Sequence, residues 1–155
     1  MALKKKSGFT LIEMLIVVAI IATLASVVLV GLGPTRRLGR DARRISDLRQ
    51  IQNGLELYFN KCSYYPGGSA SLCNGPAPAD FAGLSVALAP LGINNIPNDP
   101  SAGKTYLYGV KADGTSYTLG AQLEDTGNSA LNQSVDGDSN GIKCSRVTGL
   151  YCVQL

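Results

Sequence analysis

The most distinctive pattern in the chain is a block of apolar side chains near its N-terminus. Residues 14–33 (MLIVVAIIATLASVVLVGLG) carry no charge, and only Thr23 and Ser26 interrupt their apolar surface. A soluble core helix would show a polar stripe with a period of 3.6 residues. At a rise of about 1.5 Å per residue the block spans roughly 30 Å, which is the thickness of the hydrocarbon core of a bilayer. The pattern therefore predicts a membrane-spanning helix.

After this block the pattern becomes amphipathic. Apolar residues recur at intervals of three and four from Leu38 to Tyr58, which is typical of a helix with one buried face. We expect one helix from Phe9 to about Asn60, roughly 78 Å long if straight, with Asn60 as its C-terminal cap. The glycines and the proline at 31–34 are expected to bend or locally melt the helix, because proline removes a backbone hydrogen bond.

The remainder of the chain has the pattern of a small head built from loops and strands. Breaker residues and alternating, aromatic-rich runs follow one another from residue 62 onward. The expected elements are a surface loop at 66–80, a helix at 81–91, a turn at 97–100, strands at 105–110 and 116–123 joined by a turn at 111–114, and a last strand at 149–155. The predicted fold class is α+β, with a long N-terminal helix packed on a small antiparallel sheet.

Composition limits the functions that this fold can serve. The chain has 155 residues, of which 45% are hydrophobic, so it can form one modest domain with one long accessory element. It contains no His, which excludes His-dependent triads, His-ligated zinc sites and imidazole acid–base catalysis. Most familiar hydrolase and metalloenzyme chemistry is thereby excluded.

The net charge of +3 is a property of the extreme N-terminus. Lys4, Lys5 and Lys6 account for it, and the other Lys and Arg residues balance the Asp and Glu residues. A neutral body gives little support to nucleic-acid binding. Under the positive-inside tendency, the three lysines before the apolar block predict a cytoplasmic N-terminus and a head on the other side of the membrane.

Six arginines follow the apolar block, at positions 36, 37, 40, 43, 44 and 49. In one interpretation they form a basic collar, which contacts either lipid headgroups or the acidic face of a neighbouring subunit. In the other they lie on a solvated helix face, with Asp41 and Asp47 at pairing distance. Residues 9–61 carry a net charge of +3 and residues 62–155 a net charge of −3. Such complementary halves are suited to the stacking of subunits.

One carboxylate, Glu13, lies at the start of the apolar block. A charge there is costly unless it is paired, so an intramembrane Glu indicates a function. The next Lys or Arg downstream is Arg36, about six helical turns away. The positive partner therefore has to come from processing of the chain or from another chain.

These N-terminal residues carry a resemblance to a known family. The stretch from Lys4 to Ile21 (KKKSGFTLIEMLIVVAII) resembles the class III signal of type IV pilins and of the pseudopilins of type II secretion systems. The resemblance implies that a prepilin peptidase cuts after Gly8 and methylates the new N-terminal residue, Phe9. It also implies that Glu13 neutralises the amine of a neighbouring subunit during assembly. Such an ion pair would offset the cost of placing this carboxylate in a medium of low dielectric.

The resemblance implies a function as well. The chain would be a structural subunit, not an enzyme, of a type IV pilus-like filament or a type II secretion pseudopilus. Its segments would be a leader peptide at 1–8, a transmembrane and filament-core helix at 9–34, an amphipathic half of the stem helix at 35–61 and a head at 62–155. The implied partners are further copies in a helical filament, the prepilin peptidase, an inner-membrane assembly platform and membrane lipid.

The implied location follows from the same resemblance. The chain would first be a single-pass protein of the inner membrane, with its N-terminus in the cytoplasm and its head outside. It would then join a filament at the cell surface or in the periplasm.

Two other classes of function are alternatives to this one. A membrane-anchored extracytoplasmic module would use residues 66–100 to bind a ligand or DNA and would not polymerise. Nucleic acid stays a candidate partner, because some pilins take up DNA, although no feature of the sequence selects it. An anchored enzyme has the least support, since no Ser or Cys nucleophile lies beside a recognisable base.

The four cysteines, Cys62, Cys73, Cys144 and Cys152, all fall in the part predicted to lie outside the cytoplasm. An even number in an oxidising compartment favours disulfides. Of the three possible pairings, proximity in the sequence favours Cys62 with Cys73 and Cys144 with Cys152. A zinc site is the rival interpretation, but the spacing lacks the Cys-x-x-Cys pattern.

A last motif suggests a metal loop. Asp136, Asp138 and Asn140 place oxygen atoms at alternate positions, a Gly follows, and the Ile142 carbonyl could add a ligand. This arrangement resembles the first half of a calcium loop, with Glu124 or Asp125 to complete the shell. Val147 replaces the bidentate Glu at the twelfth position, so the loop is not an EF-hand. A solvated turn is the alternative, and both interpretations stay open.

Overall fold

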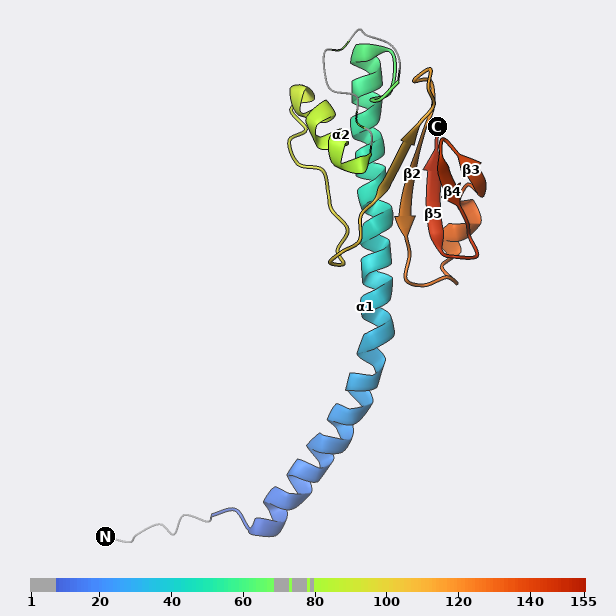
Figure 1. The fold of residues 1–155 in the computed structure, drawn as a ribbon. Helices are drawn as coiled ribbons and strands as arrows, with labels where there is room; N and C mark the ends of the chain where they lie inside the picture. The colour runs from blue at the N-terminus through green and yellow to red at the C-terminus, as the bar shows by residue number, and fades with distance from the viewer. Residues whose placement is uncertain (1–7, 69–72, 74–77, 79) are drawn as a thin grey trace, which may run out of the picture. The chain divides into compact units, whose positions relative to one another are not determined.

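The computed structural model describes residues 8–68, 73, 78 and 80–155. The chain divides into two compact units, Met1–Arg36 and Arg37–Leu155. One long helix, two sheets and several short helices make up its regular structure (Figure 1). The α+β class predicted from the sequence is confirmed, with a long N-terminal helix followed by a small antiparallel sheet.

Helix α1 runs from Leu11 to Cys62 and has 52 residues. Residues 31–34 are all helical, so the predicted local melting does not occur. The helix also passes Asn60, which is therefore not its cap. It ends where Ser63 adopts a positive φ of 61° and donates its backbone N–H to the Phe59 carbonyl at 2.7 Å. A left-handed residue just after the last turn is a common way to satisfy the final carbonyls.

The main sheet confirms the three predicted strands, each somewhat shorter than expected. It contains β1 (Leu107–Val110), β2 (Tyr117–Gln122) and β5 (Leu150–Gln154), all antiparallel and in the order β1-β2-β5. The β1–β2 turn at 111–114 closes where Gly114 N–H donates to the Lys111 carbonyl at 2.8 Å. The sheet thus leaves one edge of β1 without a neighbouring strand among the described residues.

The predicted helix at 81–91 is present as α2 (Phe81–Leu88), followed by a 3-10 turn, η1 (Ala89–Leu91). Asp80 caps α2 by accepting a hydrogen bond from the Gly83 N–H at 3.1 Å. Three elements were not predicted: the 3-10 helix η2 (Ser129–Gln133) and a two-stranded hairpin of β3 (Gly137–Ser139) and β4 (Ile142–Cys144).

The core of the second unit lies between the later half of α1, helix α2 and the main sheet. Its fully buried apolar side chains are those of Leu48, Leu55, Leu84 and Leu119, with the aromatic rings of the buried tyrosines around them. Burial of each such leucine contributes about 2 kcal/mol before the entropy cost of folding. This packing fixes the second half of α1 to the head.

Candidate assembly site

The first residues of α1 form a capping box. The Thr10 hydroxyl oxygen accepts from the Glu13 backbone N–H at 3.3 Å, and the Glu13 carboxylate accepts from the Thr10 backbone N–H at 2.8 Å. The Thr10 hydroxyl donates to the same carboxylate at 2.7 Å. This reciprocal arrangement satisfies two N–H groups at the start of the helix. Glu13 is thus held back toward the N-terminus of its own chain.

The capping box does not neutralise Glu13. Thr10 supplies only neutral donors, and within the described part of the chain no Lys or Arg forms an ion pair with Glu13. The side chain is also exposed. A carboxylate with neutral local partners keeps its charge and still needs a counter-ion if its surroundings become apolar.

The apolar side chains that follow Glu13 are exposed along the whole described length of the block. Leu11 is 78% exposed, Leu24 63% and Val27 75%. This part of α1 is long and apolar enough to cross a membrane. A monomer in water would not leave so large an apolar surface uncovered, so lipid or another protein surface has to cover it.

In the second unit, a group of ionic side chains that we call the Arg44 cluster is buried against the head. Its members are Arg40, Asp41, Arg44, Asp99, Ser101 and Glu124. Arg44 has no exposed side-chain surface. Its Nε and Nη2 donate to the two oxygens of Asp99 at 2.8 and 2.9 Å. The remaining N–H groups reach Asp41 at 2.8 Å, Glu124 at 3.0 Å and Ser101 at 2.8 Å.

This arrangement uses all five N–H donors of the Arg44 guanidinium. Asp41 in turn accepts from the backbone N–H groups of Glu124 and Asp125 at 2.9 Å each. Arg40 adds a two-pronged contact to the Glu124 carboxylate. The cluster therefore fastens two separate segments of the head, around 99–101 and 124–125, to one turn of α1.

The cluster shifts the ionisation of its members. The hydrogen bond from Arg40, reinforced by Arg44 against the cost of burial, lowers the pKa of Glu124 to about 2. Burial alone would raise the pKa of Asp99, but the hydrogen bonds from Arg44 and the Ser101 N–H outweigh it, and the net shift is downward. The carboxylates raise the pKa of Arg44. All of these groups are charged near neutral pH.

The cluster corrects the interpretation of Arg44 and Arg40, while the expected pairing of the arginines with Asp41 and Asp47 is present. Arg44 is neither part of a basic collar nor on a solvated face, and Arg40 is half-buried against Glu124. Arg37, Arg43 and Arg49 are exposed, whereas Asp41 and Asp47 are buried. Part of the charge complementarity between the stem and the head is consequently satisfied within one chain, not between subunits.

Two tyrosines strengthen the same contact between α1 and the head. Tyr106 donates its hydroxyl to Asp47 at 2.6 Å, and Tyr65 donates to Glu56 at 3.0 Å. The pKa of both phenols is raised, mainly by burial and to a smaller extent by these carboxylates. The acidic side chains on this part of α1 thus face the head, where each has a donor.

The cysteines form two disulfides, Cys62–Cys73 and Cys144–Cys152. This is the pairing that sequence proximity favours, and no cysteine is free. The first disulfide joins the end of α1 to the loop that follows. The second joins β4 to β5, and so attaches the unpredicted hairpin to the main sheet.

The segment with the calcium-loop pattern folds as the β3–β4 hairpin. Asp138 lies opposite Lys143 in the register, and Asn140, with a φ of 50°, forms the turn. The Asn140 amide donates to Ser116 and Thr118 at 3.1 Å each, and Asp136 accepts from the Arg146 N–H at 3.3 Å.

The hydrogen bonds of Asn140 use its side-chain nitrogen, whereas a calcium ion would bind its side-chain oxygen. Across the described residues, no three His, Cys, Asp or Glu side chains gather in a way that could hold a metal ion. The segment forms a hairpin, which its alternating pattern also fits, and the calcium site stays a prediction. Of the two candidates for completing the shell, Glu124 is bound to Arg40 and Arg44, and the Asp125 side chain accepts from the Gly127 N–H.

A capped apolar N-terminal helix that leads into a small disulfide-bonded antiparallel head is the architecture of a pilin-like protein. Residues 3–29 match the model of the prokaryotic N-terminal methylation motif. This match, together with the relatives below, supports the type IV pilin and pseudopilin family for this chain.

Among its relatives is the type II secretion system core protein G of Vibrio cholerae serotype O1. It is 28% identical over 134 residues, which are 81% of this chain and 87% of the relative. The protein of the same description from Aeromonas hydrophila is 32% identical over 79 residues, 49% of this chain and 55% of that one. The protein from Escherichia coli K12 is 34% identical over 65 residues, 42% and 45% of the two chains. No solved structure matches the chain.

Proposed function

We propose that the chain is a structural subunit of a type II secretion pseudopilus or of a related type IV pilus-like filament. The relatives described as core protein G favour the pseudopilus. The observation that carries the proposal is a pair of features at the start of α1. Among the described residues, Glu13 has no cationic partner, and the apolar side chains that follow it are exposed.

Processing would supply the missing cation. Cleavage after Gly8 by a prepilin peptidase removes the leader at 1–8 and exposes a new amine on Phe9, which the enzyme methylates. Since Thr10 holds the Glu13 carboxylate at the N-terminal end of the helix, the carboxylate is displayed where the amine of a neighbouring subunit can reach it. Pairing of the two charges permits both to leave water, which neither could do alone at low cost.

On assembly, the stems of other copies would replace lipid as the surface that buries the apolar side chains. Residues 9–34 lie first in the inner membrane, with a cytoplasmic N-terminus and an extracytoplasmic head, and later against the stems of other copies in the filament. Residues 35–61 carry the head at 62–155 on the filament surface. The inner-membrane assembly platform would move subunits from lipid to filament, and the filament would end in the periplasm or at the cell surface.

Mass spectrometry of the chain recovered from the cells that express it tests this function. We expect the sheared filament fraction to contain a chain that begins with N-methylated Phe9, and the membrane fraction to contain the same chain. An intact Met1, or a cut far from Gly8, would contradict the processing step. A processed chain that is found only as a monomer in the membrane would instead favour an anchored module that does not polymerise.

A further inference from the structure

The open edge of the main sheet has an unused hydrogen-bonding pattern. The Lys111 N–H donates to the Ser116 carbonyl at 2.9 Å, so Lys111 points its backbone groups toward β2. Backbone groups alternate in direction along a strand. Gly109 and Leu107 therefore also face β2, and the N–H and C=O of Tyr108 and Tyr106 point away from it. The described residues provide these outward groups with no backbone partner.

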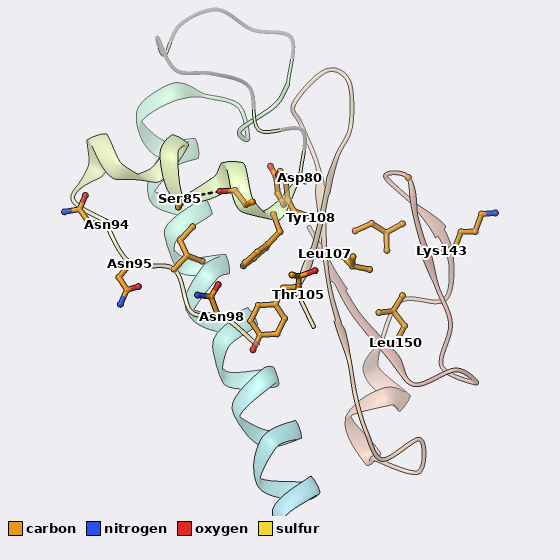
Figure 2. Close-up of a pocket in the computed structure, with 16 residues that line it drawn as sticks. Asp80, Ser85, Asn94, Asn95, Asn98, Thr105, Leu107, Tyr108, Lys143 and Leu150 are labelled. Carbon is orange, nitrogen blue, oxygen red and sulfur yellow. Dashed lines mark hydrogen bonds between the residues drawn. The ribbon is translucent and has the colours of Figure 1, made fainter. Parts of the chain in front are cut away.

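A cavity of about 820 Å³ lies beside this edge (Figure 2). It is lined from both faces of the sheet. On the face toward α1 it touches Tyr106, whose hydroxyl binds Asp47 of that helix, and the loop residue Ile96. On the opposite face it touches Leu107, and Ile142 of the β3–β4 hairpin. An occupant that lies in the plane of the sheet, alongside β1, would contact both faces.

The hairpin wall of this cavity is close to β1. A Cβ atom added to Gly109 would collide with the Asn140 carbonyl oxygen, so the hairpin packs directly over this face of the strand. On the other wall, Asn98 and Thr105 line the cavity with side chains that make no hydrogen bond within the described residues. An amide and a hydroxyl each both donate and accept hydrogen bonds, as the peptide group does.

The charge of the lining is balanced. Asp80 and Lys143 are its charged residues, and Asp80 already caps α2. Leu107 is 40% exposed, and Leu150 extends the apolar surface beside it. The cavity thus offers apolar contacts, neutral polar groups and unpaired backbone groups, and no excess of either charge.

We propose that this cavity binds an extended, uncharged segment of another polypeptide as an added strand on β1. The outward groups of Tyr106 and Tyr108 are two residues apart, which is the repeat of a strand ladder. A strand placed there continues the β1-β2-β5 ladder and points its side chains alternately toward the loop wall and the hairpin wall. Strand addition to an open sheet edge is an established way to bind peptides. The volume is also within the range of ligand sites.

The test is amide hydrogen exchange followed by NMR on the full chain in detergent micelles. The probe is the blocked peptide acetyl-Thr-Val-Thr-Val-Thr-amide, and the control is the same peptide with Pro in place of the central Thr. We expect the probe to slow exchange at Tyr106 and Tyr108 by about tenfold, as formation of new hydrogen bonds does. Exchange at Leu107 and Gly109 should change little, because their N–H groups already face β2. The control peptide should have a much smaller effect.

Two variants separate the cavity from general changes to the surface. Leu107→Lys puts a long charged side chain into the cavity and should abolish the protection. Val147→Lys makes the same change at a residue that is 88% exposed outside the cavity, and should leave the protection intact. Absence of protection at Tyr106 and Tyr108 in the unchanged chain would overturn the proposal. So would equal protection in Leu107→Lys, or protection of the same groups by chitotriose but not by the peptide, which would make the cavity a sugar site.

Discussion

The two halves of helix α1 cover their apolar surfaces in different ways. From Leu11 to Val28 the side chains are exposed, whereas Leu48, Ile51 and Leu55 are buried by the head of the same chain. The charges differ in the same way. Within the described part of the chain Glu13 has only neutral partners, whereas Arg44 has three carboxylates and a hydroxyl around it. The first half therefore needs lipid or other copies of the chain to bury its apolar surface and pair its charge. In the second half the head of the same chain does both.

The largest effect that this comparison predicts is on assembly, through the charge of Glu13. Glu13→Gln keeps an oxygen that can accept from Thr10, because Gln serves in capping boxes as well as Glu, but it removes the charge. We expect loss of most filament incorporation, measured as the share of the chain in sheared filaments, with normal membrane levels. Thr10→Val is the matched control. It removes the cap at a cost of about 1 kcal/mol and should retain far more incorporation. Normal assembly of Glu13→Gln would contradict the charge pairing.

In the second half the largest effect should come from Arg44→Met. The substitution leaves Asp41 and Asp99 buried without their cation, and breaking a buried ion pair typically costs about 3–5 kcal/mol. Denaturant unfolding of the full chain in micelles, followed by tyrosine fluorescence, would report it as a lower midpoint. Arg43→Met is the control, because Arg43 is exposed and its contact with Asp47 is 3.8 Å long; we expect a change below about 1 kcal/mol. Equal effects of the two variants would show that the Arg44 cluster does not stabilise the head.

Removal of the Cys144–Cys152 disulfide should have the next largest effect. The double substitution Cys144→Ser and Cys152→Ser should lower the free energy of unfolding by about 2–3 kcal/mol, because the disulfide restricts the conformations of the unfolded chain. Thermal melts compare this variant with the unchanged chain. If the hairpin owes its place to the disulfide, exchange should accelerate in β3 and β4 but not in α1. Uniform acceleration throughout the second unit would be the contrary result.

A smaller effect is expected from acid. The pKa of Glu124 is lowered to about 2 in the folded chain, below its ordinary value near 4.3. The folded state therefore binds fewer protons than the unfolded state in this interval, and stability falls as the pH drops from about 5 to about 2. Glu124→Gln should be less stable near neutral pH and should show a flatter acid dependence. A pH profile of the same slope in both proteins would mean that Glu124 does not contribute to the acid response.

The sequence was most informative where one physical requirement acts alone. The uncharged run at 14–33 predicted the start of the long helix, because only a helix that is apolar on all sides suits a bilayer. The alternating runs around Tyr108 and Tyr117 predicted two strands, because burial of one face of a sheet imposes a period of two. Proximity favoured the observed disulfides. The Asp136–Asn140 alternation was ambiguous, since strands and metal loops share that spacing.

The sequence was least informative about the Arg44 cluster. Arg44 precedes Leu48, Ile51 and Leu55 on the same face of the helix, and this spacing was the available signal. Its burial depends on Asp99 and Glu124, which lie 55 and 80 residues away in the chain. Nothing local indicated that they would meet. The same limit applies to the open edge of β1, because a free edge is defined by the order of the strands and not by the residues of one strand.

The most direct test of the whole account is a density map of the assembled filament at side-chain resolution. We expect the amine of Phe9 in one subunit to lie within about 4 Å of the Glu13 carboxylate of an adjacent subunit, a distance typical of ion pairs. The apolar residues that follow should be buried among neighbouring stems. A filament in which the amine and the carboxylate lie far apart, or in which the stems remain exposed, would contradict it.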